Sequence, residues 1–137
     1  MARQILVGYD GSPAAQRALD FALQLARGLG ARVRVLYAAP LPTGSPEAVA
    51  SLLADPGALH PGMAALIAER AARAGVPVDF GVVPGSAGDV LLAAIRQGSV
   101  DQLVIGSSGR GTLARWLLGS VTGMLVGNSQ IPVTVVP

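Results

Sequence analysis

The sequence predicts an α/β fold in which an open parallel sheet of five strands carries helices on both faces, a Rossmann-like architecture. Short apolar runs rich in β-branched residues alternate with longer segments whose apolar residues recur at three- and four-residue steps. The 137 residues are 51% hydrophobic and 13% charged, which suits one compact buried core. Because no internal repeat and no shift in composition marks a boundary, we expect a single domain over residues 1–137.

The expected strands and helices alternate from the first residues onward. The expected strands are 5–8, 33–37, 78–83, 101–106 and 132–136, and the expected helices are 13–29, 47–54, 63–74, 90–97 and 120–126. Ser12 before Pro13 favours a helix start, because a serine oxygen caps the first turn and proline fits it. Ser86 followed by Asp89 resembles a capping box. Sheets of this kind bind ligands beyond the carboxyl ends of their strands, where the strand order reverses.

The composition excludes several kinds of chemistry. All ten basic residues are arginines, and the missing lysine excludes a Schiff base, pyridoxal phosphate and a P-loop. Cysteine is also missing, which excludes thiol nucleophiles, disulfides and cysteine-ligated metal centres. The single histidine, His60, stands among prolines and glycines in an expected loop, which disfavours a histidine metal site.

Charge and hydropathy also limit the expected partners. The net charge is +2 and the arginines are scattered along the sequence, so nucleic-acid binding is not indicated. No apolar stretch approaches the roughly 18 to 20 residues of a transmembrane helix, and the first residues do not form a signal peptide. We therefore expect a soluble, cytoplasmic protein without a membrane partner.

Two neighbouring segments late in the chain are rich in groups that bind anions. In the segment 106–112, small residues let the backbone approach a ligand, and successive amides can form a concave anion site. Nine residues separate Gly109 from Gly119-Ser120, where a helix start would direct free N–H groups and the hydroxyls of Ser120 and Thr122 toward one space. Two such donor sets suit a ligand with several phosphates, although a simple turn is an alternative for the first segment.

The common phosphate-binding fingerprints do not match. A dinucleotide fingerprint needs Gly-x-Gly-x-x-Gly after the first strand, where the sequence reads Gly8-Tyr9-Asp10-Gly11-Ser12. The spacing of the later glycines matches a different pattern, Gly-x2-Gly-x9-Gly-(Ser/Thr). This pattern, formed by Gly106, Gly109, Gly119 and Ser120, resembles the ATP-binding branch of the universal stress protein family. The resemblance extends over the whole chain, from the aspartate after the first strand to the closing apolar strand.

The resemblance implies a strand order, a ligand and a set of binding residues. The order 3-2-1-4-5 would bring Asp10 and the glycine-rich segments to one cleft. ATP would bind there with Mg²⁺ or Mn²⁺, with Asp10 near the nucleotide or its cation and the backbone of Ala38 against adenine. The residues expected to bind the nucleotide, with Thr122 included for its hydroxyl, are Asp10, Ala38, Gly106, Gly109, Arg110, Gly119, Ser120, Val121 and Thr122.

The expected function is that of an ATP-binding stress protein acting as a nucleotide-dependent switch rather than a fast enzyme, because no convincing general base or activated nucleophile is evident. Alternatives are slow ATP hydrolysis, autophosphorylation or adenylyl transfer, binding of AMP, or a dimerisation module without nucleotide. The resemblance also suggests a homodimer formed through the strand 132–136. For Asp10 the alternative role is a cap of the first helix beside Ser12.

Overall fold

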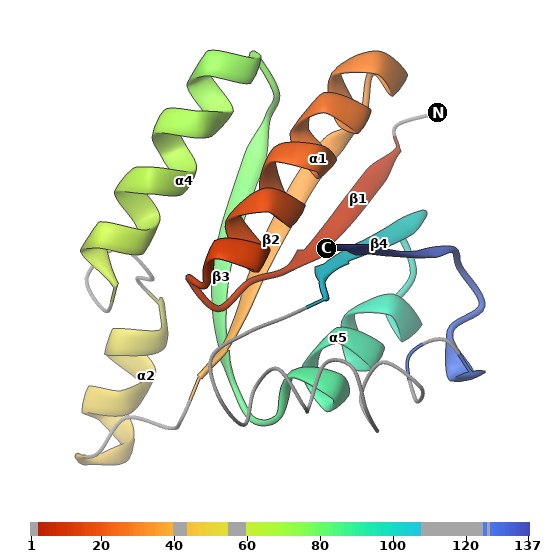
Figure 1. The fold of residues 1–137 in the computed structure, drawn as a ribbon. Coiled ribbons are helices and arrows are strands. Elements are labelled where there is room, and N and C mark those ends of the chain that lie inside the picture. Colours follow the sequence, from red (N-terminus) through yellow and green to blue (C-terminus); the bar gives the residue numbers. More distant parts are fainter. Residues whose placement is uncertain (1–2, 40–43, 55–59, 108–124, 126) are drawn as a thin grey trace.

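The computed structural model describes residues 3–39, 44–54, 60–107, 125 and 127–137. They form a five-stranded sheet of order β3-β2-β1-β4-β5 with every neighbouring pair parallel (Figure 1). The strands are β1 (Gln4–Gly8), β2 (Arg32–Ala39), β3 (Val78–Pro84), β4 (Gln102–Gly106) and β5 (Val133–Val136). The helices in the described ranges are α1 (Pro13–Leu29), α2 (Pro46–Ala54), α4 (Pro61–Ala74) and α5 (Ala87–Arg96). The expected α/β architecture and strand order are confirmed.

Several boundaries differ from the expected ones for local physical reasons. α5 begins at Ala87 because Ser86 is its N-cap: the Ser86 hydroxyl oxygen accepts the Asp89 N–H at 3.4 Å and donates to Asp89 Oδ2 at 2.9 Å. α4 begins at Pro61, since proline fits a first helical turn. β2 continues to Ala39 because β3 pairs with it that far. The expected helix 120–126 lies outside the described residues apart from residue 125.

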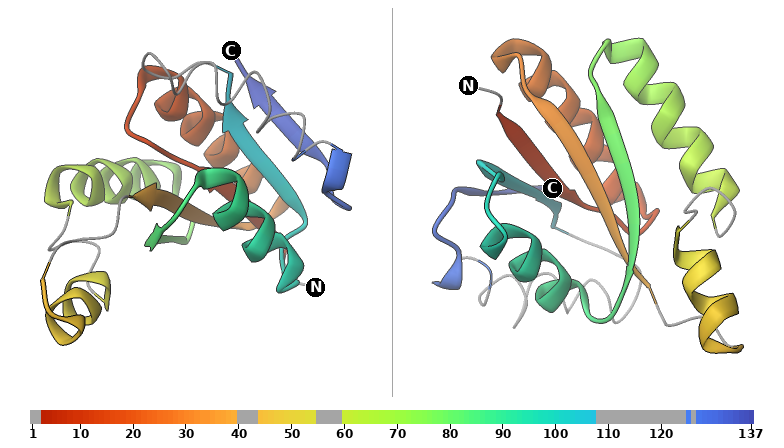
Figure 2. Two further views of the ribbon diagram at one scale, coloured as in Figure 1. Left: turned by 90° about the horizontal axis from the view of Figure 1, so that it is seen from below. Right: turned by 180° about the vertical axis from the view of Figure 1, so that it is seen from behind.

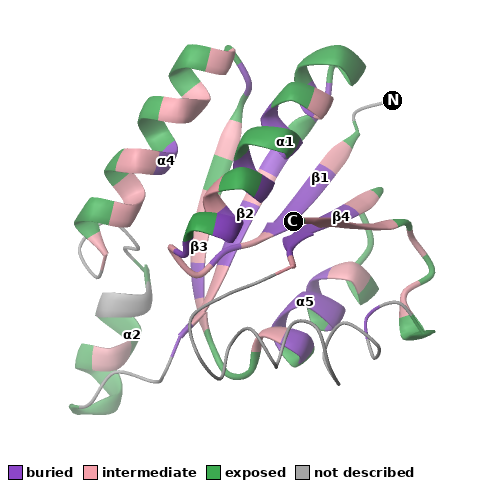
Figure 3. Ribbon diagram, viewed as in Figure 1, coloured by how far each residue is buried: buried purple, intermediate pink, exposed green. Residues whose placement is uncertain are grey.

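The two faces of the sheet carry different helices. α1 and α4 pack on the face that holds Ile5 and Val7, and α5 packs on the face that holds Leu6 (Figure 2). These three consecutive residues of β1 are at most 1% exposed, as a parallel strand covered on both faces requires. In Figure 3 the buried residues concentrate in the central strands and on the inner sides of α1 and α5, whereas much of α4 is exposed.

The helices within the described ranges do not combine the length and the apolar character that a membrane span requires.

The last residue of β4 lies against the backbone at the start of α1. A Cβ atom built on Gly106 would stand 2.8 Å from both the carbonyl carbon and the carbonyl oxygen of Ala14. Real Cβ atoms do not approach backbone so closely, so only glycine allows this contact between β4 and α1. The contact places the end of β4 beside the first turn of α1.

We predict that Gly106→Ala lowers the free energy of unfolding by about 1–3 kcal/mol, because the added methyl group must displace backbone rather than a flexible side chain. The matched control is Gly28→Ala in α1, where a Cβ meets nothing within 4 Å. This control should stabilise the protein slightly, by up to about 1 kcal/mol, because alanine favours helix. Urea unfolding measures both changes, and equal stability of Gly106→Ala and the parent would contradict the close contact.

Candidate functional site

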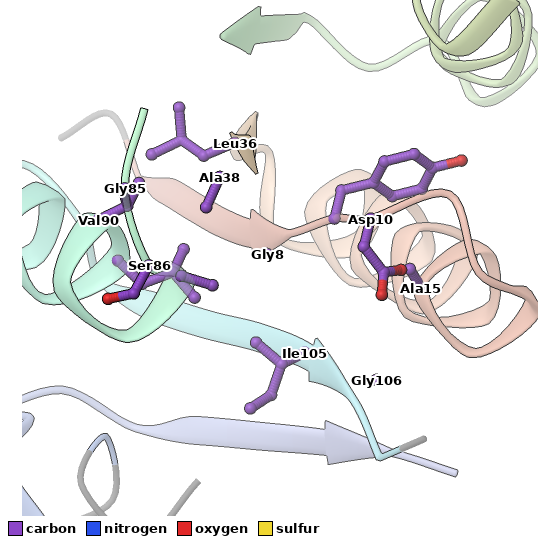
Figure 4. Close-up of a pocket in the computed structure, with 13 residues that line it drawn as sticks. Gly8, Asp10, Ala15, Leu36, Ala38, Gly85, Ser86, Val90, Ile105 and Gly106 are labelled. Atoms are coloured by element: carbon purple, nitrogen blue, oxygen red, sulfur yellow. The ribbon is translucent and has the colours of Figure 1, made fainter. Parts of the chain in front are cut away.

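A cavity of about 270 Å³ lies at the carboxyl ends of β1, β2 and β4, beside the start of α5 (Figure 4). Its volume is near the lower end of small-molecule sites, which begin at roughly 300 Å³. The cavity lies where β1 has β2 on one side and β4 on the other, so the strand order reverses there, as the topology rule predicts. The lining residues in the described part of the chain are Gly8, Tyr9, Asp10, Ala15, Leu36, Ala38, Gly85, Ser86, Ala87, Val90, Leu91, Ile105 and Gly106.

Asp10 has two carboxylate oxygens in different situations. Oδ1 accepts the backbone N–H of Ser12 at 2.9 Å, and the Ser12 hydroxyl accepts the N–H of Ala15 at 3.1 Å, so Asp10 supports the turn that starts α1. Oδ2 is buried and has no hydrogen-bond partner in the described part of the structure. Figure 4 shows this carboxylate between the end of β1 and the start of α1. The turn that starts α1 therefore uses only one of the two carboxylate oxygens of Asp10.

Tyr9, just after β1, is buried near one guanidinium and two carboxylates. Burial raises the pKa of the Tyr9 phenol above its ordinary value of 10.0; the Arg70 guanidinium opposes this, and the carboxylates of Asp10 and Asp20 add to it. Arg70 Nη1 donates to both oxygens of Asp20, at 3.0 and 2.9 Å, and Nη2 donates to Oε1 of Gln16 at 3.1 Å. Tyr9 is thus a neutral phenol at neutral pH and offers the cavity no negative charge.

The floor and walls of the cavity are mostly apolar. Leu36 of β2, Leu91 of α5 and Ile105 of β4 all lie in the core cluster on the α5 face. Gly8 keeps these side chains close together, because a Cβ there would stand 2.9 Å from Leu91 Cδ1 and 3.1 Å from Ile105 Cγ2. Such walls suit a flat apolar ring whose polar atoms lie at its edges. The topology rule points to the loop that follows Gly8, and the structure adds Gly8 itself to the lining.

The backbone of Ala38 faces an open position in the sheet. Arg32 donates its N–H to Arg3 at 2.9 Å, and Leu36 accepts the N–H of Tyr9 at 3.0 Å, so even-numbered residues of β2 direct their backbone groups toward β1. β1 ends at Gly8, which pairs with Leu36. No residue of β1 therefore stands opposite Ala38, and its N–H and C=O point to the side of β2 that borders the cavity.

The structure brings together three of the nine residues expected to bind a nucleotide. Asp10, Ala38 and Gly106 line the same cavity although they come from three different strand ends. The other six, Gly109, Arg110, Gly119, Ser120, Val121 and Thr122, lie outside the described residues. Ser86, which the sequence predicts to be a helix cap, also lines the cavity.

The described residues contain no group of three or more His, Cys, Asp or Glu side chains that could hold a metal ion. Among the described residues that line the cavity, Asp10 is the acidic one. One carboxylate can still contribute to a Mg²⁺ site when phosphate oxygens and water supply the remaining ligands. The buried oxygen Oδ2 of Asp10 fits such a role.

The family model, the relatives and the solved structures that this chain resembles all point to the same family. The model of the Universal stress protein family matches residues 1–137. A universal stress protein of Mycobacterium tuberculosis strain H37Rv is 32% identical over 142 residues, covering 98% of this chain and 95% of the relative. One from Thermus aquaticus is 32% identical over 143 residues, covering 99% of each. A crystal structure of a universal stress protein in complex with cAMP has a TM-score of 0.76 at 29% identity, covering 98% of this chain and 97% of that one.

Proposed function

Because the chain belongs to the universal stress protein family, we propose that it binds an adenine nucleotide in the cavity at the carboxyl ends of β1, β2 and β4. The observation that carries the proposal is the edge of β2 at Ala38. Its N–H and C=O point beside an apolar cavity, past the last residue of β1. An adenine ring needs this combination of a donor and an acceptor at its edge and apolar walls on its faces. The relative that binds cAMP supports an adenine-containing ligand.

The nucleotide proposed for this chain is ATP, with its phosphates on the Gly-x2-Gly-x9-Gly-Ser motif that begins at Gly106. Gly106, the first residue of this motif, lines the cavity at the end of β4 beside the first turn of α1. Gly109, Arg110, Gly119, Ser120, Val121 and Thr122 are proposed to supply backbone amides, a guanidinium and hydroxyls to the phosphates. Two donor sets favour ATP over AMP or cAMP, because each additional phosphate can use a further set.

The proposed cation is Mg²⁺ or Mn²⁺, which would neutralise the charge of the phosphates near Asp10. A carboxylate beside phosphates is repulsive unless a cation or a sugar hydroxyl lies between them. Oδ1 of Asp10 is engaged by the Ser12 N–H, so Oδ2 is the atom proposed to face the cation or its bound water. The cation would bridge phosphate oxygens and lower their negative charge.

Binding rather than fast turnover is the proposed activity. The hydroxyl of Ser86 is engaged with Asp89 as a helix cap, and the phenol of Tyr9 is held neutral by its burial. Neither group is thus activated as a nucleophile or base. The bound nucleotide is proposed to act as a switch, with the whole chain, residues 1–137, forming one nucleotide-binding unit.

A second copy of the chain is the proposed partner of β5. Leu103 donates its N–H to the carbonyl of Pro132 at 3.0 Å, and Ser107 donates to Val136 at 2.7 Å. Even-numbered residues of this strand therefore face β4, and Val133 and Val135 direct their backbone groups to the open edge of the sheet. An apolar edge strand of this kind can pair with its copy in a symmetric dimer.

Nucleotide binding in the cavity is tested by a substitution that fills the cavity. Ala38→Leu places a larger side chain in the cavity and should weaken ATP, AMP and cAMP by at least about tenfold, equivalent to about 1.4 kcal/mol. The matched control is Ala68→Leu on an exposed position of α4, which should leave binding unchanged. Isothermal titration calorimetry measures all three nucleotides. Equal affinities of Ala38→Leu and the parent, or no binding by the parent, would overturn the proposal.

The role of the cation is tested by Asp10→Asn, which keeps an oxygen for the Ser12 N–H but removes the charge. Binding of Mg²⁺ with ATP should weaken by roughly tenfold, the loss of one charge-assisted contact, whereas ATP in EDTA should bind as well or better because a repulsive charge is gone. Glu47→Gln, at an exposed position of α2, is the control. An equal loss with and without Mg²⁺ would instead indicate damage to the turn.

The dimer is tested by Val135→Pro, which removes an N–H directed away from β4 and so should leave the sheet intact. Light scattering should show the parent as a dimer and Val135→Pro shifted toward monomer, with circular dichroism confirming that the variant is folded. Adding ATP to the parent should change the dimer dissociation constant if the nucleotide acts as a switch. A parent that is monomeric with and without ATP would exclude this arrangement.

A further inference from the structure

A second cavity, of about 300 Å³, lies on the same face of the sheet as α5, between this helix and strands β2 and β3. It adjoins the first cavity, because Leu36, Gly85, Ser86 and Val90 line both. Its remaining lining is different and includes the guanidinium of Arg34 on β2. The second cavity therefore offers a positive charge, which the described lining of the first does not.

Arg34 has a buried donor that the described structure leaves without an acceptor. The Nε atom is inaccessible to solvent and makes no hydrogen bond with any described residue. The nearest charge is the carboxylate of Asp79, whose Oδ2 lies 3.9 Å from Nε, too far for a hydrogen bond. The Asp79 side chain is 70% exposed, so water screens this pair and weakens it. The Arg34 side chain as a whole is 35% exposed, so part of it remains accessible from the cavity although Nε is covered. A carboxylate bound there would give the guanidinium a closer partner than Asp79.

A residue of the first cavity also has a buried polar atom without a hydrogen-bond partner among the described residues. Among the described residues, the buried side-chain polar atoms without a partner are Oδ2 of Asp10 and Nε of Arg34. Each belongs to a residue that lines a cavity, the acceptor to the first and the donor to the second. The first cavity thus suits a cation or a donor, and the second suits an anion.

The other groups of the second cavity narrow the class of anion. Val83, Ala93 and Ala94 supply apolar surface, and the exposed Gln97 just after α5 adds an amide donor. Asp79 and Asp89 lie at the guanidinium and at the start of α5, and both repel anions. This repulsion grows with the charge of the ligand, so it is smallest for a ligand with one negative charge. A monoanion with an apolar body fits this arrangement, and a guanidinium pairs well with the planar carboxylate group.

We propose that the cavity between α5 and strands β2 and β3 is a second binding site, in which Arg34 holds the carboxylate of a small organic acid with an apolar tail. The proposed site can be tested without the nucleotide, since Arg34 does not line the first cavity. Because the two cavities share residues at the turn before α5, an acid bound in one lies next to the nucleotide proposed for the other.

The test is an NMR titration of the isotope-labelled full chain with hexanoate, using hexanol as the neutral control. Hexanoate should shift the signals of Val83, Ala93 and Gln97, and hexanol should bind at least about tenfold more weakly because it lacks the charge. Arg34→Gln should weaken hexanoate by a similar factor. Arg27→Gln, an exposed arginine of α1, should leave it unchanged. No shifts with hexanoate, equal binding of hexanol, or equal losses in both arginine variants would overturn the proposal.

A second variant protects the test against a folding defect in Arg34→Gln. Ala93 is exposed on α5, so Ala93→Leu should fold normally and obstruct the cavity while Arg34 stays in place. Its hexanoate affinity should fall at least about tenfold, whereas Ala68→Leu on α4 should bind as the parent does. The titration is repeated without and with ATP. Hexanoate binding without any ATP binding would support the second site and refute only the nucleotide proposal; unimpaired binding to Ala93→Leu would refute the second site.

Discussion

The central strand β1 is the element on which the rest of the structure depends, because it is buried on both faces and paired on both edges. Ile5, Leu6 and Val7 are at most 1% exposed, with α1 and α4 over one face and α5 over the other. A parallel strand in this position cannot shift without unpairing buried backbone groups on two sides. Its end at Gly8 therefore fixes where β2 loses a neighbour and where the first cavity opens.

The first cavity arises because neighbouring strands end at different points. β2 continues to Ala39 and β3 to Pro84, so two strands extend past the end of β1 and carry backbone groups beyond its last pair. The resulting space is lined by apolar side chains of β2, β4 and α5 and by the Asp10 carboxylate from the turn that starts α1. Backbone of β2 and the Asp10 side chain thus come to one site without any sequence motif that joins them.

In the described part of the chain, two buried polar atoms without a hydrogen-bond partner belong to residues that line the two cavities. Folded proteins pair nearly all their buried polar groups, so Oδ2 of Asp10 and Nε of Arg34 are exceptions that call for a physical reason. The cation proposed for the first cavity and the organic acid proposed for the second would supply such a reason. The turn between β3 and α5, with Gly85 and Ser86, separates the two sites, and Gly85 has a φ of +129°, which favours glycine.

The sequence by itself determined the order of strands and helices along the chain, because apolar periodicity and helix caps such as Ser12 and Ser86 act over a few residues. It also named Asp10, Ala38 and Gly106, which line the first cavity, although the ligand roles of Asp10 and Ala38 came only through resemblance to a family. Only the tertiary structure decided that Gly8 and Ser86 line the same cavity and that Arg34 lies at a second one. These placements arise from contacts between strands far apart in the sequence, and burial by distant elements leaves no local pattern in the chain.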